Sequence, residues 1–304
     1  MPSSPVWTIL ETLKWTTGYF EQRGVDQPRP SAEILLAHSL GVKRIDLYLR
    51  HDQPLNPGEL AAYKAVIRRR ARHEPVAYIT GFKGFRHLDL AVGPDVLIPR
   101  PETEILVDIA LEILPAADRK RWRVMDAGTG SGAILLALAT QRPGHFYLGL
   151  DRSFGALCQA AANGKATGGR DKEDAPGHRV VSENIFWVKM DWLTALAPRP
   201  VFDMIVSNPP YIPRADLDSL MPDVRDFEPR RALDGGPDGM APARRILHQA
   251  VPRLKAGGCL IMEMGSDQGE RLRALARRNI GWENIRIRKD DAGHDRVMIC
   301  GRKA

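Results

Sequence analysis

The chain has 304 residues, of which 43% are hydrophobic and 27% charged, a composition typical of a soluble globular protein with room for about two domains. No apolar run reaches the roughly 20 residues of a membrane span, and Glu11 and Lys14 interrupt the N-terminus before a signal-like block develops. The three cysteines are isolated and show no pairing pattern, which favours a reducing, cytoplasmic location. The eight histidines show no metal-ligand spacing, which argues against a zinc site. The net charge of +7 points to an anionic partner or environment without naming it.

Helical periodicity dominates the first part of the chain. Three amphipathic stretches separated by glycine and proline predict a small helical domain over residues 1–75; they cover 6–24, 30–41 and 56–73. The third stretch holds a basic run without an acid, made of Lys64, Arg68, Arg69, Arg70 and Arg72. This run is either a solvated helix face or an electrostatic footprint for nucleic acid or a ribonucleoprotein.

A change of pattern follows. Apolar residues alternate around Gly81 and Gly84, so a β-hairpin connector is expected over residues 76–101. Over residues 102–304 short apolar strands alternate with helices, which predicts a mostly parallel sheet covered on both faces. The expected strands are 123–127, 146–151, 185–190, 202–207, 259–265, 284–289 and 296–300. The polar, glycine-rich segment 167–179 is expected to be a mobile insertion.

A glycine-rich turn follows the first of these strands. Its candidate cofactor-binding residues are Gly128, Thr129, Gly130, Ser131 and Gly132. Glycines allow the backbone to approach a ligand closely, and the helix that follows presents unpaired N–H groups. Asp151 ends the next strand, where its carboxylate can accept both ribose hydroxyls of a nucleoside cofactor. The turn also fits the dinucleotide pattern G-x-G-x-x-A, and Asp151 alone could be a helix cap, so the pattern does not identify the cofactor.

Two further strand ends carry candidates. After the third strand, Asp191 can accept from an adenine amino group and Trp192 can lie against the ring, although a helix cap and a core aromatic explain these residues equally well. The fourth strand ends in the sequence SNPPYIP, which supplies Asn208, Pro209, Pro210 and Tyr211. Prolines cannot donate to a sheet ladder, so this is either a plain rigid turn or a carboxamide and a ring held at the strand's tip for chemistry.

These motifs together resemble S-adenosylmethionine-dependent methyltransferases that act on a planar amine or amide nitrogen. The segments EPVAYITGFKGF, LIPRPETEILVD, FEPRRALDGGPDG and DDAGHDRVMIC, with AEILLAHSLGVKRIDLYL near the N-terminus, narrow the resemblance to the release-factor glutamine methyltransferase family (PrmC/HemK) over nearly the whole chain. Related ribosomal-protein glutamine methyltransferases also carry N-P-P-Y but typically have serine after the arginine of the segment LIPRPETEILVD. Pro101 at that position therefore favours the release-factor branch. The insertion at 167–179 departs from the family pattern.

The resemblance implies a Rossmann-like seven-stranded α/β methyltransferase sheet, preceded by the helical domain and the connecting hairpin. It implies S-adenosylmethionine as cofactor and no metal; the cofactor residues would be those of the turn 128–132 with Asp151, Asp191, Trp192 and Asn208. The substrate would be the glutamine of the Gly-Gly-Gln loop in peptide chain release factors, docked by residues 1–75. Proximity to the ribosome is a further expectation, whereas a membrane or a direct nucleic-acid substrate is not expected.

The N-P-P-Y motif then acquires a chemical meaning. An amide nitrogen is a poor nucleophile, because its lone pair is delocalised into the carbonyl. The side-chain oxygen of Asn208 and the backbone carbonyl of Pro209 can each accept one N–H of the substrate amide, and so favour positive charge developing on nitrogen. Pro209 and Pro210 hold the two acceptors in place, and Tyr211 offers a flat face to the amide.

Three alternatives remain. The first two are a methyltransferase of ribosomal-protein glutamine and one of an exocyclic amine of a nucleic-acid base, which would need a wide, basic, aromatic-lined cleft. The third belongs to another class: a nicotinamide-dependent oxidoreductase or a non-catalytic cofactor-binding scaffold.

Overall fold

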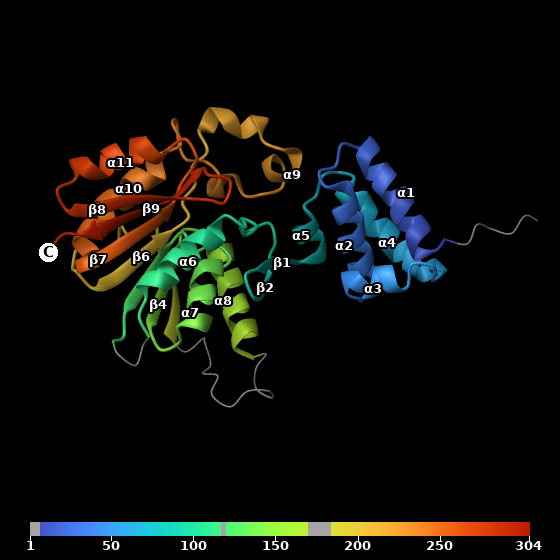
Figure 1. The fold of residues 1–304 in the computed structure, drawn as a ribbon, viewed down its shortest axis with the longest axis horizontal. Coiled ribbons are helices and arrows are strands. Elements are labelled where there is room, and N and C mark those ends of the chain that lie inside the picture. Colours follow the sequence, from blue (N-terminus) through green and yellow to red (C-terminus); the bar gives the residue numbers. More distant parts are fainter. Residues whose placement is uncertain (1–6, 117–119, 170–183) are drawn as a thin grey trace, which may run out of the picture. The chain divides into compact units, whose positions relative to one another are not determined.

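The computed structural model describes residues 7–116, 120–169 and 184–304 (Figure 1). The chain divides into two compact units: Met1–Phe82 with Met221–Phe227, and Lys83–Leu220 with Glu228–Ala304. A short segment from the second half of the chain therefore belongs to the N-terminal unit. Within the described residues, no helix is both long and apolar enough to cross a membrane.

The N-terminal unit is helical. Its helices are α1 (Ile9–Gln22), α2 (Pro28–Leu40), α3 (Arg44–Leu49), α4 (Pro57–Arg70), α5 (Val76–Thr80) and, from the later segment, α9 (Pro222–Arg225). Capping boxes start α1 at Thr8 and α4 at Asn56, each with a glutamate three residues on. One apolar cluster fills the unit, and the buried hydroxyl of Tyr63 donates to the carbonyl of Ala32 over 3.0 Å.

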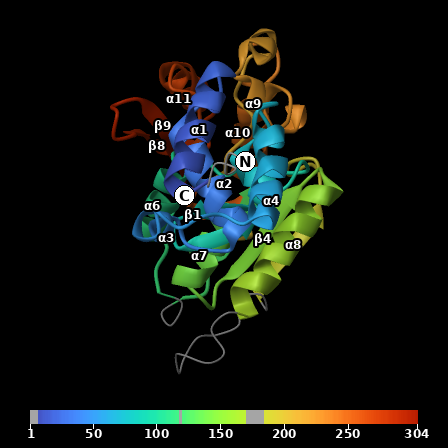
Figure 2. The same cartoon turned by 90° about the vertical axis from the view of Figure 1, so that its right-hand side faces the viewer.

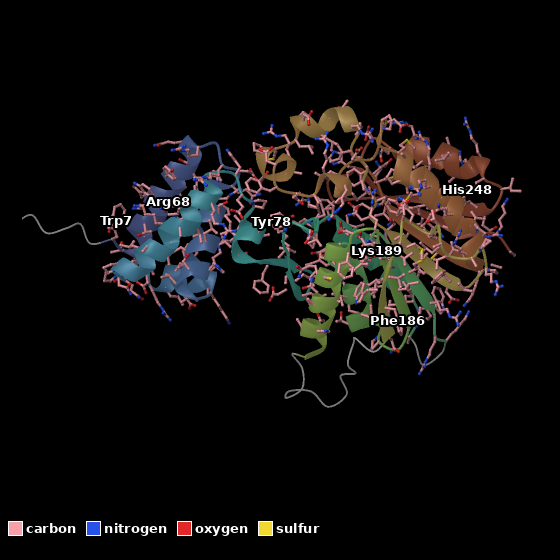
Figure 3. All side chains as sticks on the ribbon, turned by 180° about the vertical axis from the view of Figure 1, so that it is seen from behind. Trp7, Arg68, Tyr78, Phe186, Lys189 and His248 are labelled. Carbon is pink, nitrogen blue, oxygen red and sulfur yellow. The ribbon has the colours of Figure 1, made fainter. Side chains whose placement is uncertain are left out.

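The basic run on α4 is not a uniform charged face. Arg70 is only 4% exposed, because its guanidinium donates to the backbone carbonyls of Asp26 and Glu74 at 3.0 and 3.1 Å. Arg69 is exposed but pairs with the carboxylate of Glu74. The expectation of one solvated or ligand-binding run is therefore wrong for Arg70, whose charge serves the fold. Three cations at four-residue spacing stay exposed, namely Lys64, Arg68 (Figure 3) and Arg72.

The expected hairpin is shorter than its predicted range. Strands β1 (Phe82–Phe85) and β2 (Leu88–Ala91) form a separate two-stranded sheet. Residues 76–80 are the helix α5, and residues 92–101 contain no regular element. The short helices α3 and α5 were not anticipated, since five or six residues are too few to show a helical period.

The second unit is built on a seven-stranded sheet of order β5-β4-β3-β6-β7-β9-β8. Its strands are β3 (Arg123–Ala127), β4 (Phe146–Asp151), β5 (Ile185–Lys189), β6 (Phe202–Ser207), β7 (Leu254–Glu263), β8 (Trp282–Lys289) and β9 (Asp295–Arg302). The first five run parallel, and β9 pairs antiparallel with β7 and β8. The expected α/β fold and all seven strands are confirmed, although β7 begins five residues earlier than predicted.

Helices cover both faces of this sheet (Figures 1 and 2). They are α6 (Thr103–Ile113), α7 (Ala133–Gln141), α8 (Phe154–Gly169), α10 (Ala241–Ala250) and α11 (Gly269–Arg278), with short 3₁₀ turns at Arg214–Ser219, Arg230–Ala232 and Val251–Arg253. Residues alternate along β7: Cys259 and Ile261 join the core under α6 and α7, whereas Leu260 and Met262 join the core under α10 and α11. The carboxyl ends of β3, β4 and β6 consequently meet at one edge of the sheet.

The expected insertion at 167–179 falls mostly outside the described residues. Its first three residues, 167–169, complete the helix α8.

Candidate active site

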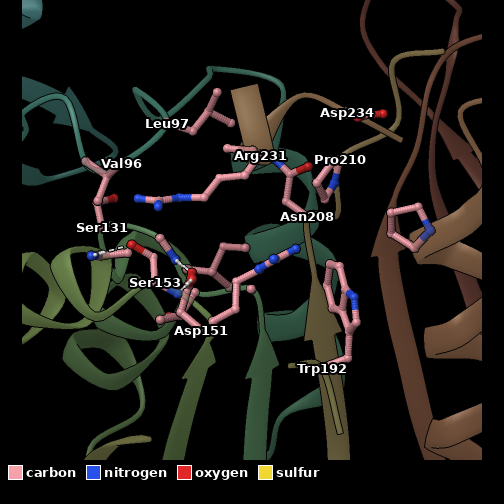
Figure 4. Close-up of a pocket in the computed structure, with 18 of the residues that line it drawn as sticks. Val96, Leu97, Ser131, Asp151, Ser153, Trp192, Asn208, Pro210, Arg231 and Asp234 are labelled. Atoms are coloured by element: carbon pink, nitrogen blue, oxygen red, sulfur yellow. Dashed lines mark hydrogen bonds between the residues drawn. The ribbon is translucent and has the colours of Figure 1, made fainter. Parts of the chain in front are cut away.

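A cavity of about 410 Å³ lies at this edge of the sheet, within the size range of small-molecule sites (Figure 4). Of the residues proposed from the sequence, nine line it: Gly128, Thr129, Gly130, Ser131, Asp151, Asp191, Trp192, Asn208 and Pro210. Gly132, Pro209 and Tyr211 are not among the lining residues. The structure therefore brings together most of a set that is spread over four separate strand ends.

The turn after β3 is fixed by backbone hydrogen bonds to β4 and by side-chain packing around Gly132. The N–H groups of Gly128 and Thr129 donate to the carbonyl of Leu150 at 2.8 and 2.9 Å. The helix α7 then starts without a side-chain cap, which leaves backbone donors at its N-terminus for an anionic group. Gly132 has φ +83°, and a Cβ there would lie 3.0 Å from the ring of Trp187 and 3.2 Å from Ala160. Packing alone thus accounts for glycine at 132.

Asp151 organises the neighbouring strand end. Its Oδ2 accepts from the N–H of Gly130 at 3.0 Å, and its Oδ1 accepts from the N–H of Ser153 at 2.8 Å (Figure 4). The first turn of α8 is capped instead by Ser153, whose hydroxyl oxygen accepts from the N–H of Ala156. Asp151 is therefore not the side-chain cap of α8. Each carboxylate oxygen retains a lone pair for a ligand that enters the cavity.

A second carboxyl group lies beneath the glycine-rich turn. Asp126 is fully buried in β3, and this burial raises the pKa of its carboxyl to about 7, with the charge of Asp151 acting in the same direction. The raised pKa of Asp126 depends on its burial, which the glycine-rich sequence around it does not reveal.

Asp191 and Trp192 also line the cavity. Asp191 is exposed and accepts from Nη2 of Arg245 at 2.7 Å, while its backbone carbonyl, not its side chain, accepts from Thr194. Trp192 has φ +53°, and its ring lies 3.4 Å from the point where a Cβ on Gly128 would stand. The indole is half-buried against the core and also lines the cavity, so packing in the core does not remove its ring from the cavity.

Asn208 stands at the tip of β6 in a defined orientation. Its Nδ2 donates to Oγ1 of Thr103 at 3.0 Å, and that hydroxyl donates to Oε2 of Glu263 at 2.7 Å. Within the described residues, Oδ1 of Asn208 accepts no hydrogen bond, and the side chain borders the cavity (Figure 4). The carboxamide therefore presents an oxygen acceptor, and not a donor, to a ligand.

The loop after Asn208 is fixed by close backbone packing. Nε2 of Gln268 donates to the carbonyls of Tyr211 and Gly239 at 2.9 and 3.1 Å. Gly239 has φ +75°, and a Cβ there would lie 2.4 Å from the Tyr211 carbonyl oxygen, so only glycine fits. Burial raises the pKa of the Tyr211 phenol to about 12, which keeps this ring neutral.

A further wall of the cavity comes from the segment LIPRPETE, which the family resemblance places at the cofactor cleft. Leu97, Pro99 and Arg100 line it. The buried carboxylate of Glu228 accepts from the guanidinium of Arg100 and from the N–H of Ile98, which ties this wall to the segment FEPRRAL. These contacts give Glu228 a structural role. A partner 128 residues away in sequence cannot be found from spacing.

Fold and site together define a Rossmann-like methyltransferase. A methyltransferase from Pyrococcus furiosus has a similar structure, with a TM-score of 0.51 at 16% identity over 78% of this chain and 99% of that one, a likeness that concerns the fold alone.

Sequence comparison assigns the family. Residues 11–81 match the model of the PrmC N-terminal domain. The release factor glutamine methyltransferase of Geobacter sulfurreducens is 41% identical over 96% of both chains, and that of Chlorobaculum tepidum is 38% identical over 99% of both. The chain belongs to the release factor glutamine methyltransferase family, a class of S-adenosylmethionine-dependent enzymes. Family membership sets aside the oxidoreductase and the non-catalytic scaffold.

Proposed function

We propose that this protein transfers a methyl group from S-adenosylmethionine to the side-chain amide nitrogen of the glutamine in the Gly-Gly-Gln motif of peptide chain release factors. The observation that carries the proposal is the oriented carboxamide of Asn208, whose oxygen borders the cavity while its nitrogen is engaged by Thr103. Such a substrate would place the protein in the cytoplasm, near the ribosome.

The cavity residues fit the cofactor. Asp151 offers carboxylate oxygens to the ribose hydroxyls, and Asp191 with Trp192 offers an acceptor and a ring face to adenine. The uncapped N-terminus of α7 offers donors to the cofactor's carboxylate. When bound, S-adenosylmethionine supplies an electrophilic methyl group on a sulfonium centre.

The residues of the N-P-P-Y motif act on the substrate amide. Oδ1 of Asn208 accepts one N–H and the carbonyl of Pro209 the other, which holds the nitrogen in place and stabilises the charge that develops on it. Pro210 fixes the turn, and Tyr211 offers its flat ring face to the amide. After transfer the nitrogen is acidic and releases its extra proton, so a dedicated histidine base is unnecessary.

Charge at the cavity supports a protein amide over a nucleic-acid base. Three of the arginines that line it are paired with carboxylates: Arg214 with Asp234, Arg231 with Asp95, and Arg245 with Asp191. A groove for a polyanion would use such cations on phosphates. Their neutralisation favours a loop of protein as the substrate.

The test is methyl transfer from tritiated S-adenosylmethionine to three classes of acceptor: an intact release factor, ribosomal proteins and DNA. A release factor whose Gly-Gly-Gln glutamine is replaced by alanine is the matched control. Label in the intact release factor and none in the control supports the proposal. Label in ribosomal protein or DNA alone would assign one of the alternatives.

A further inference from the structure

A chain of three hydrogen-bonded side chains leads from the edge of the cavity into the core. Asn208 follows β6, Thr103 begins α6 and Glu263 ends β7, so three separate elements deliver them. Thr103 is 4% exposed and Glu263 1% exposed, and the two hydrogen bonds measure 3.0 and 2.7 Å. The proposed chemistry uses only the first member of this chain.

The chemistry of the donors fixes the direction of both hydrogen bonds. A carboxylate has no proton to give, so Glu263 only accepts and the single hydroxyl proton of Thr103 is directed to it. The lone pairs of Thr103 are then what Asn208 meets, and only its NH₂ group can bond to them. Oδ1 is thereby turned away from Thr103.

We propose that Thr103 and Glu263 are positioning residues that hold the Asn208 carboxamide with its oxygen toward the substrate amide. The inference deepens the proposed function and rests on it. Without this pair the carboxamide could rotate by 180° and present NH₂ to the substrate's own NH₂, which places two donors face to face.

Protonation of Glu263 would reverse the direction of both hydrogen bonds. Its carboxyl could then donate to Thr103, whose proton would turn toward Asn208 and select the flipped amide. Burial raises the pKa of Glu263 to about 7. Two nearby arginines, Arg100 and the β9 residue Arg296, lower this pKa, and Glu102, just before α6, raises it. The Tyr211 phenol is neutral in this range and adds no charge. Within the described residues, Oε1 of Glu263 has no hydrogen-bond partner, so the carboxylate has room to take up a proton.

The expected pH effect has one sign. Above the pKa of Glu263 the ionised form holds Asn208 in the accepting orientation, and below it the flipped orientation gains population. Single-turnover methyl transfer should therefore rise between pH 6 and pH 8 in the wild-type protein.

Three variants test the pair. Thr103→Val keeps the shape but removes the hydroxyl, and we expect single-turnover transfer to fall about 10- to 100-fold with little change in cofactor affinity. Thr103→Ser restores the hydroxyl and should restore most of the rate. Glu263→Gln should lower the rate and remove the rise between pH 6 and pH 8. A wild-type rate in folded Thr103→Val, or an unchanged rate and pH profile in Glu263→Gln, would overturn the inference.

A second readout needs no catalysis. With asparagine labelled by ¹⁵N, the side-chain NH₂ of Asn208, assigned by its loss in Asn208→Ala, should be protected from solvent exchange at pH 8. That protection should disappear in Thr103→Val and weaken at pH 6 in the wild type. Equal protection in all three samples, each measured relative to the intrinsic exchange rate at its own pH, contradicts the positioning role even if the protein proves to methylate another substrate. Failure to label any release factor, with the protected signal present, would count against the proposed function alone.

Discussion

The guanidinium of Arg70 lies 3.7 Å from the carboxylate of Asp223, and both residues belong to the helical unit. Asp223 stands on α9, in the segment between the N-P-P-Y loop and Glu228. Removal of residues 1–82 would therefore strip α9 of its surroundings as well as delete the proposed docking domain. Substitutions on the surface of α4 test docking more cleanly than a truncation does.

We expect the triple variant Lys64→Ala, Arg68→Ala, Arg72→Ala to bind intact release factor roughly tenfold more weakly at low salt, because each exposed charge contributes a fraction of a kcal/mol. Cofactor affinity should stay unchanged, since these residues lie outside the unit that contains the cavity.

The matched control for that variant removes three exposed cations from the second unit: Arg277, Arg278 and Arg286. Binding of release factor is measured at several salt concentrations for both variants. Equal weakening of binding in the two variants would mean that Lys64, Arg68 and Arg72 act only through the net charge of the protein, and not through contact with the release factor.

Asp151→Ala should act on the cofactor. The variant loses a charged acceptor, and each hydrogen bond to it is worth about 1.5–3 kcal/mol, so the Kd for S-adenosylmethionine should rise about 10- to 150-fold for each ribose hydroxyl that loses its partner. Asp151→Asn keeps the shape and one acceptor oxygen and should fall between the two proteins. Calorimetric titration measures the three affinities, and equal values would limit Asp151 to bracing Gly130 and Ser153.

Asn208→Ala should show the opposite pattern. Loss of one acceptor that acts in the transition state typically lowers the rate by ~10²–10³. The same titration should show most of the cofactor affinity retained, and single-turnover transfer to intact release factor measures the rate. Near wild-type transfer would remove Asn208 from the chemistry.

The sequence predicted those parts of the fold that depend on local pattern. The five parallel strands contain apolar runs, and the antiparallel strands β8 and β9 keep an alternating or apolar pattern, so all seven strands of the large sheet were found. The start of β7 was missed because Lys255, Gly257 and Gly258 interrupt its run. Most of the candidate residues line one cavity for a related reason, since strand ends in such a sheet meet at one edge.

Tertiary partners explain what the sequence could not supply. Nothing in the run on α4 distinguishes Arg70 from Arg68, because one of the two carbonyls that accept from Arg70 belongs to Asp26, 44 residues away, and the other to Glu74 in the turn after the helix. Glu263 is 160 residues from Thr103, and its altered pKa arises from burial, which has no local signature. The supporting contacts of the site are therefore the part that required a structure.

The last prediction concerns stability. Burial raises the pKa of Glu263 in the folded protein from 4.5 to about 7, so between these values the folded state holds a proton that the unfolded chain has released. The free energy of unfolding contributed by this group is therefore present in full below pH 4.5 and is lost as pH rises toward 7, by about 3 kcal/mol at most. Asp126 changes stability in the same direction, but it is present in both the wild type and Glu263→Gln. The free energy of unfolding of Glu263→Gln, relative to that of the wild type, should therefore increase as pH rises. Urea unfolding of the two proteins at pH 5, 6, 7 and 8 measures this difference, with Asp126→Asn as the matched control. Parallel pH curves for wild type and Glu263→Gln would mean that Glu263 is ionised throughout, and the orientation of Asn208 would then not depend on pH.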